Sequence, residues 1–155
     1  MTRLEARPRV NRQALHPSIT AEQIDRLVDE FYTEVRRNTR LSPIFDANMS
    51  GDWDSHLEKM KAFWRSVLLK SGEYKGQPVP VHLKIKEVTS QDFEEWLWLF
   101  SATANRVFHG QAAELVIEAA RRIATSLWLS RSTDPFASPP AWSKPRGSEN
   151  IQLSC

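Results

Sequence analysis

The chain has 155 residues, of which 41% are hydrophobic and 26% are charged, as expected for one soluble globular domain. The formal net charge of +2 comes largely from arginines near the N-terminus, and the near-neutral centre argues against nucleic-acid binding. The only cysteine, Cys155, excludes a disulfide framework, and without a long apolar run or signal-peptide pattern we expect a cytoplasmic protein with no membrane contact.

Composition divides the chain into three regions. Residues 1–18 contain Arg, Pro and Asn without periodicity and predict a flexible N-terminal arm. Residues 133–155 are rich in Pro and Ser and predict a disordered tail. Between them, residues 19–132 carry a hydrophobic period of about 3.6 residues and no convincing alternation, which predicts one all-α domain.

The first helix is expected to begin at Thr20, because a threonine followed three residues later by Gln23 forms a capping box. Tyr32 lies on the edge of its apolar stripe, and a short turn is expected over residues 41–45. The stripe itself consists of Ile24, Leu27, Val28, Phe31 and Val35.

The second long helix is expected to open at Asp52 and to end near Gly72. A short segment, 79–86, carries His82, and Pro78 and Pro80 keep it from forming a long helix. The third helix is expected to start at Ser90 or Thr89 and to run to His109-Gly110, and the fourth to cover about 111–131. The inner face of the second helix is predicted to run through Trp53, His56, Leu57, Met60, Phe63, Trp64, Val67 and Leu68.

His82 is the most informative residue, although a lone histidine among apolar residues is more often a packed side chain than a metal ligand. His56 and Tyr32 also carry polar tips on apolar helix faces. A buried polar tip costs a few kcal/mol unless it finds a partner. Three such tips aimed at one interior favour a shared polar ligand, and a haem meets that requirement. Taken singly, Trp96 is better explained as a core residue whose polar atom bonds to the backbone.

Several short motifs, in order and spacing, resemble the group III truncated haemoglobins over about residues 16–130. They are Phe31-Tyr-Thr-Glu-Val-Arg36, Leu41-Ser-Pro-Ile-Phe45, Trp53-Asp-Ser-His56, Phe63-Trp64, Tyr74-Lys-Gly-Gln-Pro78, His82-Leu83 and Phe93-Glu-Glu-Trp-Leu-Trp-Leu-Phe100. The resemblance implies a shortened globin fold, a two-over-two helical sandwich around a haem b.

The resemblance also implies roles for individual residues. His82 matches the proximal ligand of the haem iron, and Tyr32, His56 and Trp96 match distal residues that stabilise a bound ligand. The residues expected to contact the cofactor are Phe45, Phe63, Trp64, Tyr74, His82 and Ile85.

The functional expectation is a haem protein that binds O₂, nitric oxide or a similar small ligand. With an unidentified external reductase it would act as a nitric oxide dioxygenase or show peroxidase-like activity. Two alternatives stay open, namely an O₂ or nitric oxide sensor or carrier without turnover, and a cofactor-free helical interaction module. A monomer or weak dimer is expected.

Overall fold

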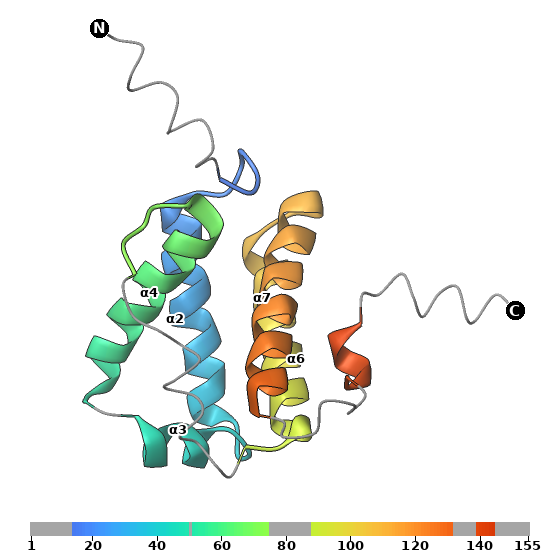
Figure 1. Cartoon of the computed structure of the whole chain (residues 1–155). Helices are drawn as coiled ribbons and strands as arrows, with labels where there is room; N and C mark the ends of the chain where they lie inside the picture. Colours follow the sequence, from blue (N-terminus) through green and yellow to red (C-terminus); the bar gives the residue numbers. More distant parts are fainter. Residues whose placement is uncertain (1–13, 50, 75–87, 132–138, 145–155) are drawn as a thin grey trace, which may run out of the picture.

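The computed structural model describes residues 14–49, 51–74, 88–131 and 139–144. Its helices are α2 (Ala21–Arg37), α3 (Ser42–Asn48), α4 (Trp53–Leu69), α6 (Ser90–Val107), α7 (Gly110–Arg131) and the 3-10 helix η1 (Ala141–Ser143). Helix α2 packs against both α4 and α6, and α6 packs against α7, so that two pairs of helices form the domain (Figure 1). No strand occurs among these described residues, and the predicted all-α class is confirmed.

Side-chain caps define where the long helices begin. Thr20 and Gln23 form the predicted capping box, and the Asp52 side chain accepts a hydrogen bond from the Ser55 amide at 2.8 Å. At α6, Thr89 is the N-cap and forms a second capping box with Asp92. Each cap stabilises its helix by about 1 kcal/mol, which fixes the register of the three helices that carry the candidate site.

The core is unevenly shared between the helices. Helix α2 buries six residues, from Ile24 to Val35, because its apolar stripe faces both α4 and α6. Helix α4 has the same length of 17 residues but buries only Trp64 and Leu68. The rest of its apolar face, including Phe63, is half-buried, so α4 presents a broad aromatic face that the domain covers only in part.

Residues 42–48 form helix α3 rather than the expected short turn. Pro43 suggested a turn, but proline is also well tolerated in the first turn of a helix, where its missing N–H would have no partner. The Asn38 side chain accepts hydrogen bonds from the amides of Arg40 and Leu41 at 3.0 and 2.8 Å. These bonds turn the chain at the end of α2 and place Phe45 beside Tyr32.

Parts of both expected tails lie against the domain. The Leu15 amide donates a hydrogen bond to the Leu68 carbonyl at 3.0 Å, within the range expected to be a flexible arm. Residues 139–144, within the range expected to be disordered, include η1, whose Trp142 packs against the core. Composition did not indicate this ordered turn because one large aromatic side chain can anchor an otherwise Pro- and Ser-rich segment.

None of the described helices is both long enough and apolar enough to cross a membrane.

Candidate functional site

Tyr32 lies at the centre of a cluster of aromatic rings. Its side chain is 4% exposed, and the centroid distances from its ring are 4.8 Å to Phe31, 5.0 Å to His56, 5.8 Å to Phe45 and 6.1 Å to Trp53. Burial raises the pKa of Tyr32, because the apolar surroundings disfavour the phenolate. The phenol therefore stays protonated at neutral pH and is available as a hydrogen-bond donor.

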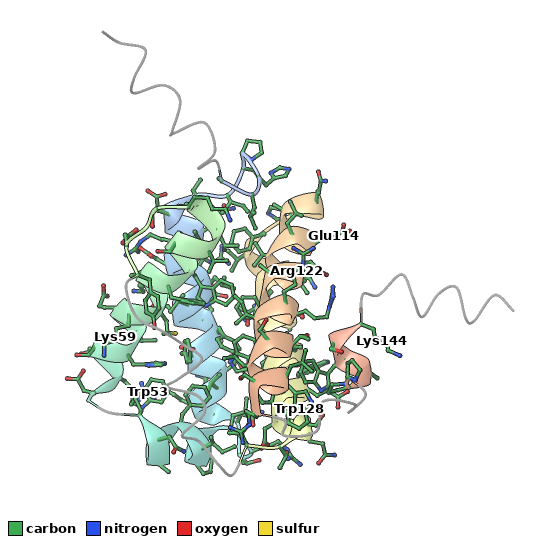
Figure 2. The ribbon with its side chains drawn as sticks, in the orientation of Figure 1. Trp53, Lys59, Glu114, Arg122, Trp128 and Lys144 are labelled. Atoms are coloured by element: carbon green, nitrogen blue, oxygen red, sulfur yellow. The ribbon has the colours of Figure 1, made fainter. Side chains whose placement is uncertain are left out.

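His56 approaches Tyr32 from α4. The two rings meet edge to face, with an interplanar angle of 89°, and the Nε2 atom of His56 is screened from solvent. Trp53, one helical turn earlier, contacts His56 at 5.6 Å and stacks on Phe45 at 6.2 Å. The Arg36 guanidinium lies 4.7 Å from the Trp53 ring centroid. Trp53 is thus held between α2, α3 and α4, at the beginning of α4 (Figure 2).

Trp96 reaches the same cluster from α6. Its ring lies 5.3 Å from Phe31, edge to face, and stacks on Phe100 at 5.3 Å. Phe31 therefore contacts both Tyr32 and Trp96, so the rings of the two candidate donors pack on the same phenylalanine. Trp96 is half-buried, which leaves part of its indole surface uncovered by the domain.

Phe63, Trp64 and Tyr74 continue the network along α4. The Phe63 ring contacts Trp64 at 5.3 Å and Tyr74 at 5.1 Å, and Trp64 contacts Phe100 at 4.9 Å. A continuous path of ring contacts therefore joins all the predicted site residues that the structure describes, which are Tyr32, Phe45, His56, Phe63, Trp64, Tyr74 and Trp96.

An ion-pair network holds Tyr74 in place. Arg65 on α4 pairs with Asp25 on α2 at 2.7 Å and with Glu73 at 2.9 Å. The Tyr74 amide donates a hydrogen bond to the Ser66 hydroxyl at 2.9 Å. These contacts fold the chain back after the end of α4, so that the Tyr74 ring meets Phe63.

His82 and Ile85 lie outside the described residues, so their predicted roles stay predictions. In the described ranges no group of three His, Cys, Asp or Glu side chains is placed to hold a metal ion. A separate open hollow on the surface contains none of the predicted site residues. It is lined by Arg40, Gln91, Glu94, Glu95 and Trp98. Trp98 is 66% exposed, as expected from its position two residues after Trp96.

The cluster suits a flat, largely apolar cofactor that also needs polar groups at its centre. Phe45, Trp53, Phe63 and Tyr74 are all half-buried, so each keeps ring surface that the domain does not cover. Tyr32 adds a buried phenol that stays protonated. A haem meets these conditions, because its porphyrin packs on aromatic rings and its bound ligand accepts hydrogen bonds.

Three residues of the network were not among the predicted site residues. Phe31 was assigned only to the apolar stripe of its helix and Phe100 only to a motif, yet they connect the rings from α2, α4 and α6. Trp53 was placed on the inner face of its helix, and its spacing of one turn before His56 is the signal that indicates a site role. The connecting positions of Phe31 and Phe100 depend on how the helices pack, which no local pattern reveals.

The chain is similar to a known protein in sequence and to a solved structure in fold. No family model matches the chain. The chain is 33% identical over 111 residues to the group 3 truncated hemoglobin ctb of Campylobacter jejuni, covering 70% of this chain and 87% of that protein. It also superposes on the crystal structure of a group III truncated hemoglobin from Campylobacter jejuni with a TM-score of 0.70 and 32% identity, covering 76% of this chain and 95% of the other.

Proposed function

Because the chain belongs to the group III truncated haemoglobins, we propose that it binds haem b against the aromatic network of α2, α4 and α6, with His82 as the protein ligand of the iron. Haem iron supplies reversible binding of O₂ and other diatomic ligands and one-electron chemistry. Phe45, Phe63, Trp64 and Tyr74 hold the ring by packing, as does Ile85, and they keep water from its face.

The observation that carries the proposal is the environment of Tyr32. A tyrosine that is 4% exposed, protonated, and surrounded by rings from three helices can direct its O–H at a ligand in a site that excludes water. Bound O₂ carries partial negative charge, and a hydrogen bond to a charged acceptor contributes about 1.5–3 kcal/mol. Tyr32 is therefore the main residue that retains the ligand.

Trp96 and His56 complete the distal side in this proposal. The Trp96 Nε1–H is a second donor, and the Trp96 ring also packs edge to face on Phe31. His56 lies next to Tyr32 on a different helix, so a change of its rotamer opens or closes the approach to Tyr32 without moving α2. We assign His56 to control of ligand access, and Tyr32 and Trp96 to ligand retention.

Retention by two or three donors favours chemistry over transport, because strongly held O₂ is released slowly. We propose that held O₂ combines with nitric oxide and one electron to give nitrate, with an external reductase of unidentified type as the electron source. The chain's own residues hold O₂ in place for that encounter. Repeated turnover in stopped-flow mixing with nitric oxide and a reductant tests this step. A single stoichiometric reaction would instead make the protein a sensor or carrier.

Haem binding itself is tested by absorption spectroscopy after haem is added to the purified chain. We expect an intense band near the violet edge of the visible range, and we expect His82→Ala to abolish or strongly shift it. His56→Ala is the matched control, because it removes an imidazole on the other side of the site and should leave haem bound. A chain that gives no such band is a cofactor-free helical module, and the proposed function is then wrong.

A further inference from the structure

The 3-10 helix η1 contacts the beginning of α6 through a cluster of three aromatic rings. Trp142 stacks on Phe93 with a centroid distance of 5.7 Å and an interplanar angle of 7°. Trp128 on α7 meets the same phenylalanine edge to face at 5.7 Å. Phe93 is thus enclosed between α7 and η1, and Figure 2 shows Trp128 at the end of α7 that lies beside η1.

Polar contacts fix the same turn of α6. The Trp142 indole N–H donates a hydrogen bond to the Ser90 hydroxyl at 3.0 Å. Arg131 at the end of α7 donates to the Val88 carbonyl at 3.2 Å. Arg40 pairs at 3.1 Å with Asp92, whose side chain is only 6% exposed. Three groups therefore hold the start of α6, namely Trp142 of η1, Arg131 and Arg40, and of these only Trp142 lies outside the predicted globin domain.

The turn that η1 holds is directly connected to the candidate site. Trp96 lies one helical turn after Phe93, so any tilt of the first turns of α6 moves the Trp96 indole relative to Phe31. His82 is six residues before Val88 in the sequence. Through the start of α6, η1 can therefore change the position of Trp96, although η1 itself lies outside the predicted domain.

We propose that residues 139–144 form a strap that fixes the first two turns of α6, and that Trp142 is a positioning residue for Trp96. The effect on ligand retention rests on the proposed function, whereas the effect on α6 does not. The strap needs one indole that both stacks and donates, and Trp142 makes both contacts.

Hydrogen exchange of the haem-free full chain tests the strap directly. Trp142→Ala should raise the exchange rates of the Phe93–Trp96 amides about tenfold, because their acceptors lie in the turn that the strap holds. The α2 amides should change less than about twofold. Trp98→Ala is the matched control, since it removes an exposed indole from the same helix. Exchange in Trp142→Ala equal to that in Trp98→Ala overturns the strap.

Milder variants keep the test decisive if Trp142→Ala does not fold. Trp142→Phe retains a ring for the stack and loses only the N–H, and Ser90→Ala removes the acceptor of the same bond. Each should raise exchange in the first turn of α6 by about threefold, and the double variant should add nothing further. Additive effects of the two substitutions would show that the 3.0 Å hydrogen bond does not hold the turn, and would overturn the assignment.

The positioning role is tested by O₂ release from the haem-bound chain. Trp142→Ala should speed release about threefold in the parent chain and have no effect when Trp96 is already phenylalanine. An equal effect in both backgrounds overturns positioning through Trp96. A general loss of stability would lower the melting temperature without this dependence on Trp96. Failure of the proposed function is recognised separately, since a parent chain without a haem band leaves the exchange result intact.

Discussion

Replacement of Tyr32 by phenylalanine isolates one hydroxyl group within the aromatic network. The ring keeps its contacts with Phe31, His56, Phe45 and Trp53, so packing changes little. Because only one oxygen atom is removed, the free energy of unfolding of the haem-free protein should change by less than about 0.5 kcal/mol.

The expected effect on the haem-bound protein is much larger. With 4% exposure at Tyr32, water is not available to replace the lost donor. A hydrogen bond to a charged acceptor contributes about 1.5–3 kcal/mol, but Trp96 is a second donor to the same ligand, so we expect a loss of about 1.5–2 kcal/mol. Since 1.4 kcal/mol corresponds to a factor of ten, O₂ release should become about 10–30 times faster.

The assay is stopped-flow displacement of O₂ from the ferrous haem-bound protein. Tyr74→Phe is the control, because Tyr74 is the only other tyrosine and contacts Phe63 at the far end of the network. It should leave the release rate within about twofold of the parent. A Tyr32→Phe release rate inside the same twofold range would refute the reasoning and assign ligand retention to Trp96 or His56.

Three further predictions concern pH and ligand access. Burial raises the pKa of Tyr32 above its usual 10.0, so the unfolded chain loses this proton first and the free energy of unfolding should fall as pH rises past about 10. Urea unfolding between pH 8 and 11 should show a smaller fall in this free energy for Tyr32→Phe than for the parent. Hydrogen bonds from Arg65, and also from Ser71, lower the pKa of Glu73 below 4.5. The ion pair therefore stabilises the folded state above that pH, and this stabilisation is lost as pH falls. Glu73→Gln should make the fall of the free energy of unfolding with acid shallower, and an unchanged slope would contradict the ion pair's role. His56→Ala should change the ligand association rate after flash photolysis more than the equilibrium affinity, and the opposite pattern would exclude access control.

Local signals in the sequence predicted the long helices well. Thr20, Asp52 and Thr89 are capping residues that act within one turn, so their effect is readable from neighbouring residues alone. Helix α3 was missed because Pro43 is compatible with both a turn and the first turn of a helix. What decides between them is the Asn38 side chain and the packing of Phe45 on Tyr32, and the second of these is a tertiary contact.

The candidate site was less completely predictable. Tyr32 and His56 were recognisable as site residues, because a polar group on an apolar helix face is costly to bury unless it has a partner. Phe31 and Phe100 did not stand out, since a core phenylalanine and one that joins two functional rings look alike in sequence. The packing of Trp142 could not be predicted for another reason. Its partner Phe93 is 49 positions earlier in the chain, and no sequence periodicity links the two residues.

The partly covered face of α4 couples the amount of folded protein to the supply of cofactor. A 17-residue helix with two buried side chains gains little from packing alone. A ligand that binds only the native state stabilises it by about 2.7 kcal/mol at a hundred times its dissociation constant. When haem is scarce, α4 should be among the first helices to open, exposing rings to proteolysis. Cells short of haem would then contain less of this protein, because a larger unfolded fraction is open to degradation.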